Sequence, residues 1–318
     1  MSKKSLKLDR NFIKKSFVPF VWSVIRLILL IGLSYTILYP LMTKLVLVFM
    51  DKQDLSDFSV QWVPKHYTLS NITTTLEILD YWPTLLKSIC LCSAVCILQI
   101  TVCTLAAYGF ARFKSKIRKL LFGLVLATLL IPPHTYIVTL YTQFQHFDFL
   151  GIISLFNGEG INLLDSAWTF IVLAATGMGI RSGLYIYVEK QTFASLPHEL
   201  EEAAEVDGAG MFRTFISVML PNAVPSIVMC MILSFIWQWN DTFYTTYLSP
   251  GIDLLSQKIS SLNYSISMYL GDWESRNSQY ALLLTAAGTL LCVLPLIILF
   301  IACQRFFVQG VERSGLVG

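Results

Sequence analysis

The sequence predicts an all-α protein that crosses a membrane six times. Of its 318 residues, 55% are hydrophobic and only 14% are charged, whereas soluble proteins average about 25% charged residues. The apolar residues also lie in long blocks that show neither helical nor strand spacing. Because a bilayer core needs about 20 apolar residues per helix, each block is long enough to be a membrane span.

Six blocks reach the length of a membrane-spanning helix. They cover residues 17–39, 84–110, 120–140, 166–188, 221–239 and 281–303. The first block follows lysines, as the apolar core of a signal peptide does, but it is too long and no small-residue cleavage pattern follows it. We therefore expect a true first span, which can continue to Met50.

Lysine and arginine indicate which side of the membrane each loop faces. Six of them lie in the arm 1–16, and five lie between residues 112 and 119. The positive-inside rule places both clusters in the cytoplasm. The segment 143–165 contains neither residue type and is expected outside. Alternation then places the loop 189–217 and the tail 304–318 in the cytoplasm.

The chain thus divides into four parts. They are the cytoplasmic arm 1–16, a first span with an external segment over 17–83, a transmembrane core of five helices over 84–303, and the cytoplasmic tail 304–318. Such a protein is expected in the cytoplasmic membrane, with both termini in the cytoplasm and lipid around its spans.

The cytoplasmic loop after the fourth block contains an acidic cluster. Residues 199–208 read Glu-Leu-Glu-Glu-Ala-Ala-Glu-Val-Asp-Gly, and anionic lipid headgroups would repel these carboxylates. Pro197 suits a first helical turn, acids stabilise the positive helix end, and Gly208 can take the left-handed conformation that ends a helix. We predict a short helix over about 197–207 and another from Met211. Charge alone fits a docking helix for a soluble protein and a solvated surface helix equally well.

A twenty-residue pattern runs from this cluster into the fifth block. Glu202-Ala203-Ala204 is followed after three residues by Gly208, and later by Leu220-Pro221. The pattern resembles the E-A-A loop of bacterial ABC-importer permeases, with Val218 at the apolar position near its end. The resemblance implies that the loop docks on a cytoplasmic ATPase. The residues that it assigns to this coupling are Glu199, Glu202, Ala203, Ala204, Asp207, Gly208, Ala209 and Pro221.

Shorter motifs in the same order and spacing extend the resemblance over residues 62–318. They are Pro-Lys-His-Tyr-Thr-Leu-Ser-Asn at 64–71, Ala-Ala-Tyr-Gly-Phe-Ala-Arg-Phe at 106–113, Trp-Asn-Asp at 239–241 and Gln-Arg-Phe-Phe-Val-Gln-Gly at 304–310. Together they look like the maltose-transporter type of carbohydrate permease. Residues 314–318 depart from it by lacking a lysine that the family often has.

This resemblance implies the type I ABC importer permease fold and the import of a mono- or oligosaccharide. The partners that it implies are a second, related permease subunit, two ATP-binding cassette ATPase subunits and an external sugar-binding protein. The alternatives that stay open are an importer for an amino acid, a peptide or a polyamine and, with less support, an intramembrane enzyme or a secondary transporter.

Four residues in or beside the spans are candidate contacts along the substrate pathway. They are Gln99, Arg181, Trp239 and Asn240. Arg181 is the strongest candidate, because a charge inside a span costs about 3 kcal/mol on insertion scales. Its position also fits an arginine that snorkels to the membrane surface or pairs with another helix. The tryptophan equally fits an interfacial aromatic belt.

Several other functions lack the residues that they would need. The seven cysteines lie in or beside spans, and the sequence contains neither a metal-ligand pattern nor a phosphate-binding loop. We therefore expect no cofactor, no metal and no enzymatic activity in this chain, with ATP hydrolysis on partner subunits. The net charge of +3 comes from topology-determining lysines and arginines, so we expect no nucleic-acid partner.

Overall fold

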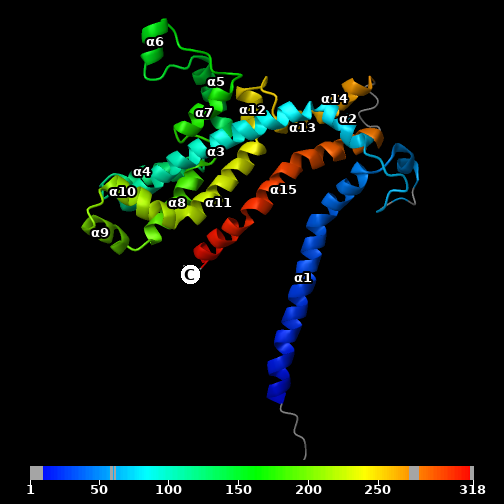
Figure 1. Cartoon of the computed structure of the whole chain (residues 1–318), viewed down its shortest axis with the longest axis horizontal. Coiled ribbons are helices and arrows are strands. Elements are labelled where there is room, and N and C mark those ends of the chain that lie inside the picture. Colours follow the sequence, from blue (N-terminus) through cyan, green and yellow to red (C-terminus); the bar gives the residue numbers. More distant parts are fainter. Residues whose placement is uncertain (1–9, 58–59, 61, 272–278, 316–318) are drawn as a thin grey trace, which may run out of the picture.

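The computed structural model describes residues 10–57, 60, 62–271 and 279–315 of the chain. All named elements in these ranges are helical, and their β structure is limited to two isolated bridges. Figure 1 shows long helices crossing the molecule, with short helices gathered at their ends. The predicted all-α class is therefore confirmed.

The bounds of the helices follow the chain in order. The described part contains α1 (Arg10–Val48), α2 (Ser70–Ile78), α3 (Tyr81–Arg112), α4 (Arg118–Ala127), α5 (Ile137–Gln145), α6 (Ile152–Asn157), α7 (Ala167–Ala175), α8 (Ser182–Ser195), α9 (Glu199–Val206), α10 (Met211–Thr214), α11 (Leu220–Trp239), α12 (Phe243–Leu248), α13 (Leu255–Ser260), α14 (Leu262–Leu270) and α15 (Gln279–Gly315). Thus α15 continues into the expected tail, whereas part of the N-terminal arm 1–16 lies outside the described residues.

Four helical stretches of the described chain are long and apolar enough to cross a membrane. They are Pro19–Val48 in α1, Tyr81–Arg112 in α3, Met211–Trp239 through α10 and α11, and Gln279–Phe306 in α15. These stretches match the first, second, fifth and sixth predicted blocks.

Two prolines break the third block. α4 ends at Ala127, and α5 begins only at Ile137. Between them Pro132 is extended, with φ −64° and ψ 139°, and Pro133 begins a single 3₁₀ turn. Proline lacks the N–H that continues a helix and keeps the preceding residue out of the α conformation. The continuous helix expected over 120–140 is thus two shorter helices.

Left-handed residues break the fourth block. α7 ends at Ala175 and α8 begins at Ser182. Between them Gly177 has φ +72° and Arg181 has φ +59°, and a residue with positive φ cannot continue a right-handed helix. The continuous helix expected over 166–188 is therefore also two helices. The count of six spans remains a prediction.

The central helix of the bundle is α3, which packs against α7, α8 and α11 (Figure 1). A buried cluster joins one end of these helices to the acidic loop. Within this cluster the ring of Tyr108 contacts the rings of Phe193 and Phe215, with centroids 5.5 and 4.8 Å away. Aromatic contacts of this kind add to the area that they bury. The loop is therefore attached to the core of the bundle.

In contrast, α1 stands apart from the other helices (Figure 1). It packs on α15 near its own C-terminal end, where Val48 lies against Ala286 and Ala287. None of the residues in the apolar window of α1 is buried within the chain. An apolar surface of this length is covered in the membrane by lipid or by another subunit.

The stretch 51–57 contains three aspartates, and one of them, Asp54, anchors the segment that follows α1. Asp54 is buried, and its Oδ2 accepts the backbone N–H groups of Lys65 and His66, both at 2.8 Å. Its Oδ1 lies 2.7 Å from the Nδ1 of His66. These hydrogen bonds, above all the one from the backbone of His66, lower the pKa of the Asp54 carboxyl.

Candidate functional site

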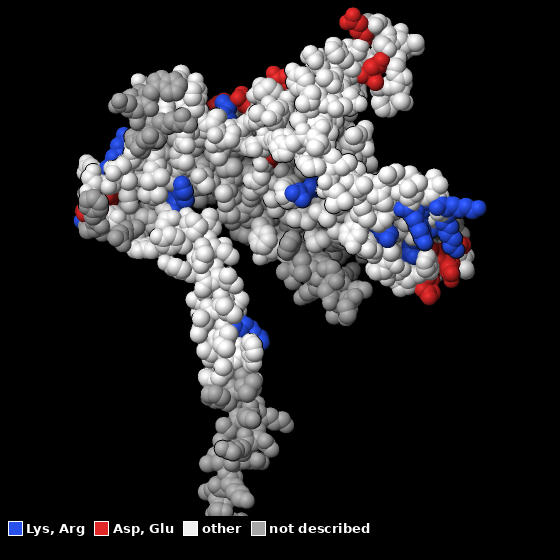
Figure 2. All heavy atoms as spheres, turned by 180° about the vertical axis from the view of Figure 1, so that it is seen from behind, with Lys and Arg blue, Asp and Glu red and all other residues white. Residues whose placement is uncertain are grey.

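The acidic loop forms two short helices at one end of the molecule. α9 begins at Glu199 and α10 begins at Met211, close to the predicted positions. Both lie beside the end of α3, where that helix passes into α4 (Figure 1). Figure 2 shows acidic and basic side chains gathered at this end. The loop is therefore a charged surface on an otherwise apolar protein.

Gly208 ends α9 in the way that the sequence predicts. Its φ is +78°, its N–H donates to the carbonyl of Glu205 at 3.0 Å, and the N–H of Ala209 donates to the carbonyl of Ala204 at 2.9 Å. A Cβ atom on Gly208 would meet nothing within 4 Å. The requirement for glycine therefore comes from the backbone conformation and not from a neighbouring group.

Glu201 attaches α9 to α3, a role that the sequence analysis missed. Its Oε1 accepts the hydroxyl of Tyr108 at 2.9 Å, and its Oε2 lies 3.2 Å from the Nε of Arg112. That Nε makes no directional hydrogen bond, so the contact is an ion pair. Another nitrogen of Arg112, Nη2, donates to the carbonyl of Leu196 at 2.8 Å. Tyr108 and Arg112 lie four residues apart on α3, and helical spacing could have indicated this shared partner.

The opposite face of α9 is exposed. Among the residues assigned to coupling, Glu199, Glu202, Ala203, Asp207 and Gly208 are exposed, Ala209 is half-buried, and Ala204 is buried against the bundle. Large apolar side chains lie among these acids, namely Val206 at 88%, Phe212 at 71% and Met211 at 64% exposure. Apolar groups rimmed by charge are typical of a protein-binding surface.

Pro221 is exposed and lies inside a continuous run of helix from Met211 to Trp239. The turn before it, Phe215–Met219, is a π turn, in which the N–H of Leu220 donates to the carbonyl of Phe215. Proline has no N–H to donate, and its ring would collide with a carbonyl in a regular α-helix. The wider turn therefore lets the helix pass through Pro221 without a break.

Gln99 holds the break in the fourth block together. Its Nε2 donates to the carbonyl of Ile180 and to the Oγ of Ser182, both at 2.8 Å, and its Oε1 accepts the hydroxyl of Ser234 at 2.8 Å. Its side chain is buried. These bonds join α3, α8 and α11 at one level. Gln99 is therefore engaged inside the protein and offers no free group to a solute in this structure.

The other three pathway candidates have different surroundings. Trp239 is buried and lies against Phe235, with ring centroids 5.7 Å apart. Asn240 is exposed, and its Nδ2 donates to the carbonyl of Ile236 at 2.9 Å. Arg181 is also exposed, and its guanidinium lies 3.7 Å from the ring centroid of Trp237. Arg181 and Trp237 are thus brought together, whereas Trp239 faces the interior.

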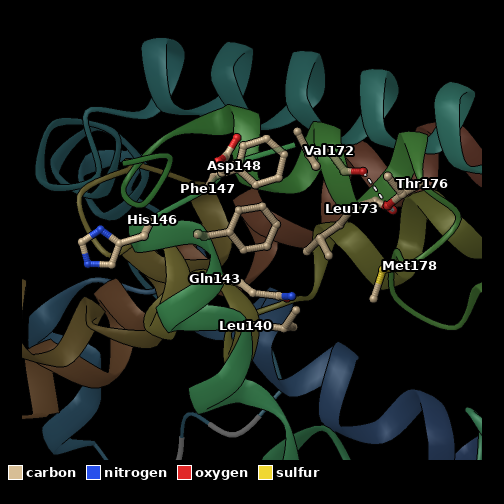
Figure 3. Close-up of a pocket in the computed structure, with 10 residues that line it drawn as sticks. Leu140, Gln143, His146, Phe147, Asp148, Val172, Leu173, Thr176 and Met178 are labelled. Carbon is tan, nitrogen blue, oxygen red and sulfur yellow. Dashed lines mark hydrogen bonds between the residues drawn. The ribbon is translucent and has the colours of Figure 1, made fainter. Parts of the chain in front are cut away.

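A cavity of about 220 Å³ lies between α5 and α7, next to the break between α7 and α8 (Figure 3). Leu140, Leu173 and Met178 line one end of it, and His146 lies at the other. Asp148 is already used, because its Oδ1 accepts the N–H groups of Ile153 and Ser154. The side chain of Ser154 lowers the pKa of this carboxyl most, and the two backbone bonds lower it further. The walls are otherwise largely apolar, so the cavity offers few groups that would orient a polar solute.

Comparison with known families places most of the chain in one of them. Residues 99–313 match the family described as the binding-protein-dependent transport system inner membrane component. The match covers the segment from Gln99 through both broken spans, α9, α11 and most of α15. A member of this family is a transport subunit and not an enzyme.

Three related proteins are carbohydrate permeases by name. The chain is 27% identical to the melibiose/raffinose/stachyose import permease protein MelC of Bacillus subtilis (strain 168), over 82% of this chain and 86% of that protein. It is 28% identical to the maltodextrin transport system permease protein MdxG of the same organism, over 90% and 93%. It is 30% identical to the alpha-glucoside transport system permease protein AglG of Rhizobium meliloti (strain 1021), over 82% of this chain and 63% of that protein.

The fold also resembles that of a solved transporter. A chain from the crystal structure of a bacterial ABC transporter involved in the import of the acidic polysaccharide alginate superposes with a TM-score of 0.72 at 18% identity. The superposition covers 92% of this chain and 98% of that chain. The architecture of the present chain is therefore that of an ABC importer permease.

Proposed function

Because this chain belongs to the family of inner membrane components of binding-protein-dependent transport systems, we propose that it is a permease subunit of an ATP-driven importer for a mono- or oligosaccharide. The names of the related permeases support a carbohydrate as the cargo. The chain lies in the cytoplasmic membrane with both termini in the cytoplasm. It crosses the membrane six times, twice through a broken helix.

The two faces of α9 carry the coupling part of this proposal. One face is attached to α3 through Glu201, Tyr108 and Arg112. The other presents Glu202 and Val206 to the surroundings. A helix with one attached face and one free face transmits movement when a partner binds the free face. The partner is one of two cytoplasmic ATPase subunits.

Movement of α9 reaches the spans through α3. Because Glu201 pairs with the end of α3, a displacement of α9 pulls on Arg112. Gln99, thirteen residues earlier on the same helix, is bonded to Ser182 on α8 and Ser234 on α11. ATP-driven closure of the ATPases would therefore move these three helices together. A second permease subunit completes the pathway, and an external sugar-binding protein delivers the cargo.

The decisive test of coupling is a cross-link to the ATPase. In a variant without native cysteines, Val206→Cys on α9 should form a disulfide with a cysteine series on the ATPase surface, and ATP should change its yield. Glu159→Cys, exposed in the segment expected outside, is the matched control. A Val206→Cys variant that never cross-links while uptake remains normal would contradict the assignment of α9.

Cargo class is tested separately by uptake into proteoliposomes that contain the complete complex. The panel should include mono- and oligosaccharides together with an amino acid, a peptide and a polyamine. ATP-dependent uptake of a saccharide alone supports the proposal. Uptake of one of the other solutes alone would reject a carbohydrate cargo, and uptake without ATP would reject the ATP-driven mechanism.

A further inference from the structure

In both broken spans, residues at the irregular turn are exposed on the surface of this chain. At the first break Leu130 is 83% and Ile131 is 50% exposed, and at the second Met178 is 65% exposed. Non-helical backbone at membrane depth is tolerated only where protein buries it or where it lines a water-filled cavity. The two breaks therefore face the partner subunit or the solute pathway and not lipid.

Arg181 lies at the end of the second break, far from the cytoplasmic loop. The helices α8 and α11 run antiparallel, since the hydroxyl of Thr192 donates to that of Ser226 at 2.8 Å and Arg181 stacks on Trp237 at 3.7 Å. Arg181 is eleven residues from Thr192, and Trp237 is eleven residues from Ser226. Eleven residues span about 16 Å along a helix. Arg181 is therefore beyond reach of the cytoplasmic surface.

The charge of Arg181 has no acidic partner in the part of the chain that the structure describes. The acid nearest to Trp237 in the sequence is Asp241, four residues later, and it is buried. Its carboxylate, however, is committed to the N–H groups of Tyr244 and Thr245 and to the hydroxyl of Thr245. The stacked guanidinium keeps its N–H edge available, and this planar fork matches a carboxylate or a phosphate. The positive end of α8, a helix of 14 residues, begins directly after Arg181.

Exposed side chains suited to a sugar follow the stacking partner of Arg181 along the chain. Trp237 is 39% exposed and Tyr247 is 52% exposed, and Asn240 lies one helical turn after Trp237. The ring of Phe243 touches that of Tyr247, with centroids 5.1 Å apart. Aromatic faces stack on sugar rings, whereas an arginine adds selectivity for negative charge.

We propose that Arg181, stacked on Trp237, binds an anionic group of the transported saccharide, either a uronate carboxylate or a sugar phosphate. This inference rests on the proposed function, because it names the class of saccharide that the importer carries. It also explains why a cation without an internal partner lies beside an exposed break in a span.

The test compares acidic with neutral cargo in the complete complex reconstituted in zwitterionic vesicles. The cargo panel pairs each uronate oligosaccharide and each sugar phosphate with its uncharged counterpart. Wild-type complex should take up an acidic member in preference to its neutral counterpart, and the member preferred identifies the anion. Arg181→Gln should lower the ratio of acidic to neutral uptake at least tenfold, and Arg181→Lys should lower it less. Because all variants share one binding protein, its own selectivity cancels in this comparison.

Arg26→Gln is the matched control, since Arg26 is an exposed arginine of α1, and it should leave the ratio unchanged. Wild-type uptake of neutral saccharides only would overturn the inference and leave the proposed function intact. An Arg181→Gln effect that is equal for both cargo classes would assign the residue to subunit contact instead. A defect that follows the content of anionic lipid would assign it to a lipid phosphate. If Arg181→Gln fails to assemble, uptake of the cargo panel by the wild type and by Arg181→Lys tests the inference. If the wild-type complex takes up no saccharide, both this inference and the proposed function fail.

Discussion

Glu201 and Glu202 are neighbours in the sequence, but only Glu201 turns toward the bundle. Its side chain is 16% exposed and lies against an Arg112 side chain that is 5% exposed. The same carboxylate accepts the hydroxyl of Tyr108, and a hydrogen bond to a charged group contributes about 1.5–3 kcal/mol. Because both contacts join α9 to α3, we expect this energy to hold α9 in place.

Glu201→Gln should therefore loosen α9 by about 2 kcal/mol, since the substitution removes the charge that faces Arg112. Hydrogen exchange of the α9 amides in the purified subunit should become at least tenfold faster. Glu202→Gln should leave this exchange unchanged and weaken binding of the ATPase, because Glu202 is exposed. Equal exchange in the two variants would contradict the internal role of Glu201.

Gly208 allows a second residue-scale prediction, with Gly210 as its control. Gly208 has φ +78°, and Gly210 has φ −69°. A Cβ atom would meet nothing within 4 Å at either position. Gly208→Ala should cost about 1 kcal/mol through the left-handed conformation, whereas Gly210→Ala should cost almost nothing.

The cost at Gly208 should appear as reduced coupling in the complex. We expect Gly208→Ala to lower sugar uptake per ATP hydrolysed severalfold, and the larger perturbation Gly208→Pro to abolish uptake without preventing membrane insertion. Measurement of uptake and hydrolysis in the same vesicles separates coupling from expression. If Gly208→Ala and Gly210→Ala behave alike, the left-handed turn is not needed for coupling.

Asp54 makes the external segment sensitive to acid. Because folding lowers its pKa below the ordinary value of 3.8, its contribution to stability is complete above that value and is lost as the pH falls through the lower folded value. The amides of Lys65 and His66 should be protected at pH 7 and exposed at strongly acidic pH. Asp54→Asn should expose them at pH 7, while Asp51→Asn should have a smaller effect. Hydrogen exchange, corrected for its intrinsic pH dependence, measures the effect of pH and of each substitution. Full protection of these amides in Asp54→Asn would contradict the anchoring role of Asp54.

The two interrupted spans determine where the residues at their breaks lie, including Arg181. Prolines set the first break, whereas a buried amide holds the second. At the second, a Cβ atom on Gly179 would lie 2.8 Å from the Nε2 of Gln99, so the side chain of Gln99 and the backbone of the break fit closely. The position of Arg181 therefore depends on contacts between α3 and the break.

Two substitutions test this fit. Gln99→Leu leaves the carbonyl of Ile180 and the hydroxyl of Ser234 without the Gln99 amide, at a cost of about 1–3 kcal/mol for each buried group. The hydroxyl of Ser182 keeps its hydrogen bond to the carbonyl of Gly179. Gly179→Ala forces the Gln99 amide to move. Both should lower the melting temperature of the purified subunit, whereas Gly123→Ala in α4, where a Cβ would meet nothing within 4 Å, should not. Unchanged melting in Gln99→Leu would show that the network contributes little.

At the scale of the whole molecule, the predicted orientation in the membrane can be tested by labelling. The predicted topology places Ser115 and His198 in the cytoplasm and Glu159 outside, and the structure places exposed residues at all three positions. In a variant without native cysteines, an impermeant thiol reagent should label Glu159→Cys in intact cells. It should label Ser115→Cys and His198→Cys only after permeabilisation. Labelling of His198→Cys from outside would reject the cytoplasmic location of α9 and the coupling mechanism with it.

The free surfaces of the molecule indicate that it functions in an assembly. The apolar window of α1, the two exposed breaks and the apolar residues of α9 each lack a cover within the described chain. Lipid suffices for α1, but it cannot satisfy irregular backbone or acidic side chains. The breaks therefore face a protein partner or the aqueous solute pathway, and α9 faces water or a protein partner. The proposed second permease and ATPases would supply such partners.

The sequence by itself determined the membrane class, the helical architecture, the acidic helix and the glycine that ends it. Block length, charge and turn preference are local properties, and they depend little on what packs nearby. The block 120–140 contains Pro132-Pro133, and the structure shows a full interruption of the helix there.

Only the tertiary structure decided which side chains face the candidate sites and which face the core. Trp237 and Trp239 are two residues apart, yet α11 turns Trp239 into the core and leaves Trp237 against Arg181. Likewise, Glu201 turns inward only because the end of α3 lies beside α9. These assignments depend on the direction in which each helix faces its neighbours. That direction is set by contacts between residues far apart in the chain, which the local sequence pattern does not contain.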